Sequence, residues 1–380
     1  MIRRNLFDRY FLIITQMKLI HIIAFFVIFL TSCNNRSVNT ESENIRTFPV
    51  SIRISDCFNS VNGELKLSEI AENIDYIKLE TNQESLLGGI LTIDPFDNGY
   101  LIVDNTESVF LFDKDGKFKW KLNKKGRGPT EYVELSVPIG IDTVFKEIII
   151  PDNRNLVIYD FNGQFKRKLK IPFRTNGVYI LPSGNYVLWC VNPFETFIAH
   201  IIDRNGNPIK HFANHNLSKR LNEDGVFRNQ AISLTDPYGN GIFLSNKDTI
   251  WFLDENFKLD TRYLIESKVK NFDDRFYVYG YNVISKSLIG FFIFKTREYF
   301  IYNINNNEFY SIKNGIEDDI DFGPSAITGL GDAHNIISIC SPSTLISLKS
   351  RIPEGSLLFD IIQTLKEDDN PVIRIIKLKE

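Results

Sequence analysis

The chain has 380 residues, of which 43% are hydrophobic and 24% charged, a composition typical of a soluble globular body. Its 44 basic and 47 acidic residues give a net charge of −3, and because residues 1–32 contribute +3, the remainder carries −6. An acidic body lacks the cationic surface that nucleic acids require, so we exclude a nucleic-acid partner.

The first segment has the pattern of an export signal. Residues 17–33 (MKLIHIIAFFVIFLTSC) place one lysine before an apolar run from Leu19 to Leu30. Twelve residues rise about 18 Å as a helix, which is short of the roughly 30 Å hydrocarbon core of a bilayer. We therefore expect residues 1–32 to be a lipoprotein signal peptide, with Met17 as an alternative start, rather than an uncleaved anchor.

The end of this segment resembles the lipobox of bacterial lipoproteins, in which a cysteine is acylated and becomes the new N-terminus. The matching residues are Leu30-Thr31-Ser32-Cys33. The resemblance implies lipid attachment at Cys33, palmitate included, followed by a polar tether over residues 33–47. We expect the lipid bilayer of the outer membrane to hold the protein on the periplasmic side, because residues 34–38 (NNRSV) lack an acidic cluster.

Residues 48–75 precede the repeats and are expected to be an N-terminal extension. Beyond them, VFLFDKDGKFKWKL at 109–122 aligns without a gap on LVIYDFNGQFKRKL at 156–169, an offset of 47 residues. In both copies a D-x-x-G turn joins two alternating runs, which is a hairpin signal. Fainter copies follow, and in the one at 241–260 Asn256 is expected at the glycine position.

A period in the forties with several short strands in each unit predicts a six-bladed β-propeller over residues 76–380. The abundance of Phe (31) and Tyr (15) favours the same all-β class. We expect four-stranded antiparallel blades and a ring closed by the N- and C-terminal strands at Ile74–Leu79 and Val372–Leu378. Residues 356–371 have helical spacing with Ser356 as N-cap, which predicts one short C-terminal helix.

Residues 123–132 (NKKGRGPTEY) combine two glycines with three cations. The spacing fits neither G-x-G-x-x-G nor G-x-x-x-x-G-K-[ST], so we do not predict a nucleotide loop. We expect the segment to cross from the outer strand of one blade to the inner strand of the next. Lys124, Lys125 and Arg127 are then candidates for binding an anionic ligand such as a carboxylate or a sugar acid. The alternative is that Glu131 and Glu134 neutralise them.

The run from Gly126 to Leu169 resembles an NHL-type repeat. From about residue 65 to residue 380, the chain resembles the six-bladed β-propeller lipoproteins of Bacteroidota. The shared motifs are K-G-x-G-P-x-E-[FY] at 125–132, a strand of I-x-x-I-x-Y-I-x-L-E-T type at 70–81, and N-P-V at 370–372. The resemblance implies the propeller fold and a membrane tether, and it implies no particular reaction, because members of this family mostly lack an assigned chemistry.

The sequence contains no G-x-S-x-G elbow and no H-E-x-x-H motif. We therefore expect a scaffold that binds a protein, a carbohydrate or another anionic ligand, without catalysis and without a cofactor. The alternative is a channel-metal-dependent hydrolase or lyase that resembles the lactonase-like propellers. That resemblance implies Asp104 and Asp152 as candidates for holding a divalent cation, although Asp-Asn pairs such as theirs are also common in Asx turns.

Overall fold

The computed structural model describes residues 47–54, 56–59, 61–96, 98–189, 196–213, 233–235, 241–246, 249–266, 278–283, 288–293, 298–312, 315–325, 330–331 and 335–379. The chain divides into two units, Met1–Thr47 and Phe48–Glu380, and every described strand belongs to the second. Among the described residues, the structure has no helix whose length and apolar character would let it cross a membrane.

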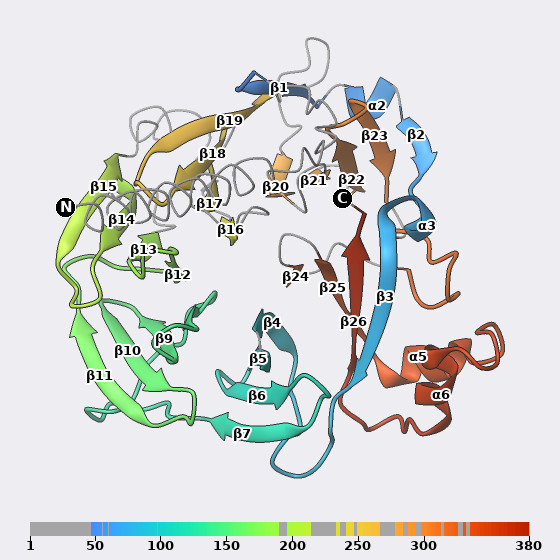
Figure 1. Cartoon of the computed structure of the whole chain (residues 1–380), viewed down its shortest axis with the longest axis horizontal. Coiled ribbons are helices and arrows are strands. Elements are labelled where there is room, and N and C mark those ends of the chain that lie inside the picture. Colours follow the sequence, from blue (N-terminus) through green and yellow to red (C-terminus); the bar gives the residue numbers. More distant parts are fainter. Residues whose placement is uncertain are drawn as a thin grey trace, which may run out of the picture. The chain divides into compact units, whose positions relative to one another are not determined.

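Six sheets form the blades of a ring (Figure 1), which confirms the predicted six-bladed propeller. The strands of blades 1 to 3, from inner to outer in each, are β4 (Ile90–Phe96), β5 (Gly99–Asp104), β6 (Val109–Asp113) and β7 (Phe118–Leu122); β8 (Gly140–Asp142), β9 (Glu147–Asp152), β10 (Asn155–Asp160) and β11 (Phe165–Lys170); and β12 (Gly177–Ile180), β13 (Tyr186–Trp189), β14 (Phe197–Ile202) and β15 (Pro208–Ala213).

Blades 4 to 6 repeat this order of antiparallel strands. Their strands are β16 (Ser233–Thr235), β17 (Gly241–Asn246), β18 (Thr249–Asp254) and β19 (Leu259–Glu266); β20 (Val278–Val283), β21 (Leu288–Ile293), β22 (Glu298–Asn303) and β23 (Glu308–Ser311); and β24 (Leu330–Gly331), β25 (Asn335–Cys340), β26 (Val372–Leu378) and β3 (Ala71–Lys78). Blade 6 thus takes its outer strand from the N-terminal part of the chain. The pairing of β3 with β26 confirms the predicted closure of the ring.

The closure is reinforced by Asn370, the first residue of the N-P-V motif, which is 1% exposed. Its side-chain amide donates hydrogen bonds to the carbonyl oxygens of Glu80 (2.8 Å) and Ser85 (2.9 Å), and its backbone N–H donates to Thr81 Oγ1 (2.7 Å). Glu80 and Thr81 end the other motif, at 70–81. Two motifs nearly 300 residues apart are therefore joined by one set of hydrogen bonds.

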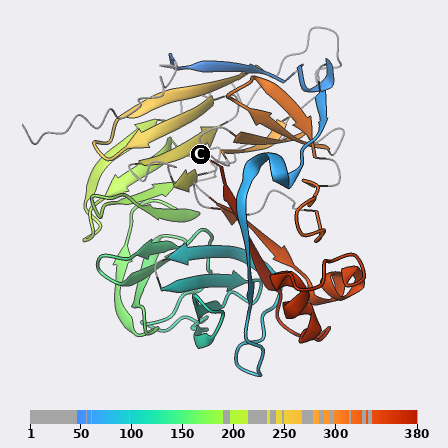
Figure 2. The same cartoon turned by 45° about the vertical axis from the view of Figure 1, so that its right-hand side comes forward.

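The N-terminal extension lies along the outside of the ring, as Figures 1 and 2 show in blue. β1 (Val50–Arg53) pairs in parallel with the outer strand β19, and β2 (Val61–Glu64) pairs in parallel with the outer strand β23. Two blades therefore have five strands where four were predicted. The added strands cover edges that would otherwise offer unpaired backbone groups. We call β1, β2 and β3 the N-terminal belt. Helices α2 (Asp56–Asn59) and α3 (Leu67–Ile70) connect its strands.

The hydrophobic cores lie between neighbouring blades. All six residues of β9 are buried, and successive side chains of a strand point to opposite faces of the sheet. Ile148 and Ile150 accordingly pack in the core cluster shared with blade 1, whereas Ile149 packs in the cluster shared with blade 3. The side chains of such a strand therefore pack in two cores, one on each face of the sheet. This explains why the strand is apolar throughout and does not alternate between apolar and polar residues.

The predicted D-x-x-G turns join the third and fourth strands of blades 1 to 3. In each turn one Asp oxygen accepts N–H groups two and four residues further on, as Asp160 does from Asn162 (2.8 Å) and Gln164 (2.9 Å). Gly163 adopts φ 73°, a conformation that favours glycine. Blade 4 has the same turn, but Phe257 with φ 63° stands at the glycine position, so the prediction of Asn256 there was wrong by one residue.

A β-bulge follows the turn in these outer strands. The pairing of β10 with β11 skips Lys166, and the pairing of β6 with β7 skips Lys119, which is the equivalent residue in blade 1. A bulged residue breaks the alternation of side chains, so two consecutive residues can point to the same side. In blade 2 these two residues are Lys166 and Arg167.

The predicted C-terminal helix is present as α6 (Leu357–Gln363), with Ser356 Oγ accepting the Phe359 N–H at 3.2 Å. It ends earlier than residue 371. A second short helix, α5 (Pro342–Leu348), was not predicted. Both contribute to a core cluster with Tyr76 and Val372, so the insertion between β25 and β26 packs on the closing blade.

Candidate functional site

The segment NKKGRGPTEY connects the outer strand β7 of blade 1 to the inner strand β8 of blade 2, as predicted. Its backbone closes on itself, because Gly126 N–H donates to the Tyr132 carbonyl (2.9 Å) and Tyr132 N–H donates to the Lys124 carbonyl (3.1 Å). The buried Tyr132 hydroxyl donates to the Glu107 carbonyl at 2.7 Å. The crossover is therefore held in one shape against the β5–β6 turn.

The two glycines of this segment make room for a carboxylate rather than for a phosphate. A Cβ on Gly126 would lie 2.0 Å from Glu131 Oε2, and a Cβ on Gly128 would lie 3.0 Å from the same oxygen. Glu131 Oε2 accepts the Gly128 N–H at 2.7 Å. In the K-G-x-G-P-x-E motif, the side chain of the glutamate therefore lies over the backbone of the two glycines.

Of the three candidate cations in the crossover, one is paired. Lys125 Nζ lies 2.7 Å from Glu107 Oε1. Lys124 and Arg127 are exposed, and neither forms an ion pair with any residue that the structure describes. Glu131 lies over Gly126 and Gly128 within the same crossover and accepts the Gly128 N–H, and Glu134 lies 3.9 Å from Arg174, so neither carboxylate forms an ion pair with Lys124 or Arg127.

Asp104 and Asp152 are buried and hold the crossovers in place. Asp104 Oδ2 accepts the Gly88 N–H (2.9 Å), and Asp152 Oδ1 accepts the N–H groups of Val133 and Glu134 (both 3.1 Å). Each carboxylate therefore ties the crossover that enters its blade to the end of the second strand. Within the described ranges, no group of three or more His, Cys, Asp or Glu side chains is placed to hold a metal ion.

Two inner strands carry titratable side chains that the sequence pattern did not single out. Asp94 on β4 accepts a hydrogen bond from Thr92 Oγ1 (3.0 Å), and burial raises the pKa of Asp94 to about 6. Burial, followed by the charge of Asp94, raises the pKa of Tyr179 on β12. The available signal was position, because Thr92 and Asp94 are polar residues two apart on one face of a strand.

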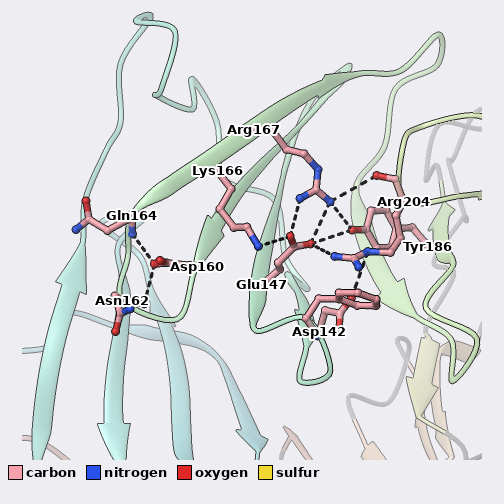
Figure 3. Close-up of polar contacts among 10 residues, drawn as sticks. Asp142, Glu147, Asp160, Asn162, Gln164, Lys166, Arg167, Tyr186 and Arg204 are labelled. Carbon is pink, nitrogen blue, oxygen red and sulfur yellow. Dashed lines mark hydrogen bonds and ion pairs between the residues drawn. The ribbon is translucent and has the colours of Figure 1, made fainter.

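A denser polar cluster joins blades 2 and 3 (Figure 3). Glu147, at the start of β9, is 1% exposed and receives three cations from two other segments. Its Oε1 lies 2.6 Å from Lys166 Nζ and 2.6 Å from Arg167 Nη1, while Oε2 binds Arg167 Nη2 (3.0 Å) and Arg204. The bulge in β11 is what lets both Lys166 and Arg167 reach one carboxylate.

The three cations determine the direction in which the pKa of Glu147 shifts. Burial acts to raise the pKa of Glu147, but hydrogen bonds from Arg167, Lys166 and Arg204 outweigh it and lower the pKa to about 2. Arg204 also stacks on Phe145, with 3.2 Å between its guanidinium carbon and the ring centroid. The buried carboxylate therefore fixes three partly exposed cationic side chains at the surface.

Comparison with known proteins identifies a matching family and a similar fold. A family model described as a domain of unknown function, DUF4934, matches residues 49–377. A Bacteroides fragilis structure titled "Putative exported protein" has a TM-score of 0.65 at 17% identity and covers 87% of this chain and 99% of that one. BamB of Moraxella catarrhalis has a TM-score of 0.38 at 13% identity, covering 71% and 70%. No curated protein matches the chain. The similarity to the Bacteroides fragilis protein shows a shared fold.

Proposed function

We propose that this chain, which belongs to the DUF4934 family whose model spans nearly all of the propeller, is a lipid-tethered, extracytoplasmic scaffold that binds an anionic ligand. The ligand is a carbohydrate acid or an acidic segment of a protein. The observation that carries the proposal is the crossover 123–132, which presents Lys124 and Arg127 on a backbone held in one shape. The acidic remainder of the chain makes such a local cationic surface a preferred place for an anion.

The tether rests on residues 17–33, in which a short apolar run precedes Cys33. Acylation of Cys33 would hold the protein at the periplasmic side of the outer membrane, since each buried CH₂ contributes about 0.8 kcal/mol. The name of the similar Bacteroides fragilis protein agrees with an extracytoplasmic location. The first described strand is β1, and the polar residues 33–47 precede it, which is the arrangement that a tethered propeller needs.

Cys33→Ser is expected to abolish lipid attachment and to release the protein from the membrane fraction. Without the thiol no thioether to diacylglycerol forms, and the mature chain keeps only its polar tether. Labelling with a fatty-acid analogue and fractionation after a carbonate wash would measure both effects. A variant that remains in the washed membranes would contradict lipid tethering and would indicate an uncleaved anchor.

Lys124→Glu combined with Arg127→Glu is expected to weaken binding of an acidic polysaccharide such as polygalacturonate by at least about tenfold, because two attractive charges become repulsive. Titration at low salt would measure the affinity, and raising the salt to about 1 M should weaken the unmodified protein similarly. Lys377→Glu, which changes an exposed lysine of β26 that pairs with Glu72, is the control. Equal affinity of the double variant and the control would contradict binding at the crossover.

A further inference from the structure

The turn between β8 and β9 projects apolar side chains into solvent. Val144 is 79% exposed and Phe145 is 50% exposed, although large apolar side chains are generally covered. Lys146 follows them, is exposed, and adopts φ 51°, so the turn is sharp. A Cβ on Gly184, in the turn that precedes β13, would lie 4.0 Å from both Phe145 and Arg204, so this place is where blades 2 and 3 meet.

Cations surround this apolar turn. The side chains of Lys166, Arg167 and Arg204 are 38%, 31% and 24% exposed, whereas the carboxylates of Glu147 and Asp142 beneath them are only 2% exposed. Solvent therefore meets the cations and not the carboxylates. We call the whole surface the basic tip; it consists of Val144, Phe145, Lys146, Lys166, Arg167 and Arg204.

Two of these cations, Lys166 and Arg167, follow each other at the start of β11, which then runs away from the basic tip. The later basic residues of this segment lie elsewhere, since Lys168 pairs with Asp152 and Arg174 lies 3.9 Å from Glu134. The side chains of the cluster are also fixed, because Glu147 binds three of them and Phe145 stacks on Arg204. A surface that docks on a membrane needs cations that bind lipid headgroups and apolar side chains that enter the interface. The basic tip has both.

We propose that the basic tip docks on an anionic lipid surface, with Val144 and Phe145 entering the interfacial region and the cations contacting headgroup phosphates. Charge complementarity selects an anionic surface, and the two exposed apolar side chains select a lipid over a soluble anion. This docking goes beyond the proposed ligand binding at the crossover, because it uses different residues. It orients a propeller that a single acyl cysteine would leave free to turn.

The test uses residues 34–380, which lack both the apolar signal segment and Cys33, so that any vesicle binding comes from the surface of the remaining chain. Sedimentation with vesicles of equimolar phosphatidylcholine and phosphatidylglycerol is expected to show binding that pure phosphatidylcholine does not support. Lys146→Gln is expected to weaken this binding about fivefold. Val144→Asp is expected to weaken it by at least about tenfold, because the valine leaves the interface.

Lys377→Gln and Leu86→Asp are the controls, since Lys377 and Leu86 are an exposed lysine and an exposed apolar residue on other parts of the propeller. Both should bind vesicles like the parent chain, and circular dichroism should show all four variants folded. Equal binding to neutral and anionic vesicles, or no effect of Val144→Asp and Lys146→Gln, would overturn the proposal. Binding that survives Val144→Asp but is displaced by soluble polyglutamate would also overturn it and would assign the surface to an acidic protein segment.

Discussion

Replacing Arg374 by methionine is expected to lower the free energy of unfolding of the propeller by about 3 to 5 kcal/mol. Arg374 lies in the middle of the closing strand β26 and is 1% exposed. Its Nη1 donates to Asp318 Oδ2 (2.9 Å) and to the carbonyl of Pro324 (2.7 Å), and its Nε donates to Ser338 Oγ (2.9 Å). Methionine keeps most of the volume but leaves the fully buried Asp318 carboxylate without its counter-charge.

Urea unfolding of matched variants would separate this effect from a general effect of substitution in β26. Lys377→Met changes a residue of the same strand whose ion pair with Glu72 is about half exposed, so its loss should be below about 1 kcal/mol. Adding Asp318→Asn to Arg374→Met should restore part of the stability, since the uncompensated charge is then removed. An Arg374→Met protein as stable as the Lys377→Met control would show that the pair does not stabilise the closing blade.

Glu147→Gln is expected to remove about 3 kcal/mol of stability at neutral pH, and the loss should disappear in acid. The pKa of Glu147 is depressed from 4.5 to about 2 in the folded protein. A depressed carboxyl pKa contributes stability that is fully present above the unfolded pKa and is lost as the pH falls through the folded pKa. The contribution of Glu147 should therefore decline between about pH 4.5 and pH 2.

The measurement is the difference in unfolding free energy between the parent protein and Glu147→Gln at a series of pH values. The difference should be largest above pH 4.5 and approach zero near pH 2. Glu72→Gln, which changes a carboxylate with a half-exposed side chain, should show a small difference at every pH. A Glu147→Gln difference that does not change with pH would mean that the cations do not favour the ionised form.

The propeller could be predicted from the sequence because its signals are local and repeated. Each D-x-x-G turn and its flanking strands lie within about fifteen residues, so the copies at 109–122 and 156–169 align directly. The N-terminal belt could not be predicted in this way. The pairing of β1 with β19 is parallel and joins residues more than 200 positions apart. Neither segment contains a motif from which its partner strand could be predicted.

The residues of the candidate sites were likewise predictable where they lie close together in the sequence and not where they come from different blades. The crossover 123–132 was predicted because its glycines, cations and glutamate stand within ten residues. The Glu147 cluster was not, because Arg204 comes from the next blade, 57 positions later, and Lys166 reaches the carboxylate only through a bulge. Arg374 did carry a signal, since it shares a strand face with Val372 and Ile376 and alternation therefore predicts that it is buried.

The N-terminal belt also sets an order for biosynthesis. A ribosome makes β3 about 300 residues before it makes the partner strand β26, and at about 5 to 20 residues per second that interval is roughly 15 to 60 seconds. Throughout it, a nascent chain carries β3 without its partner, whereas the partners of β1 and β2, which are β19 and β23, are made before β26. A chain that stops short of β26 leaves β3 without its partner permanently, which gives chaperones and proteases a means to distinguish unfinished molecules from finished ones.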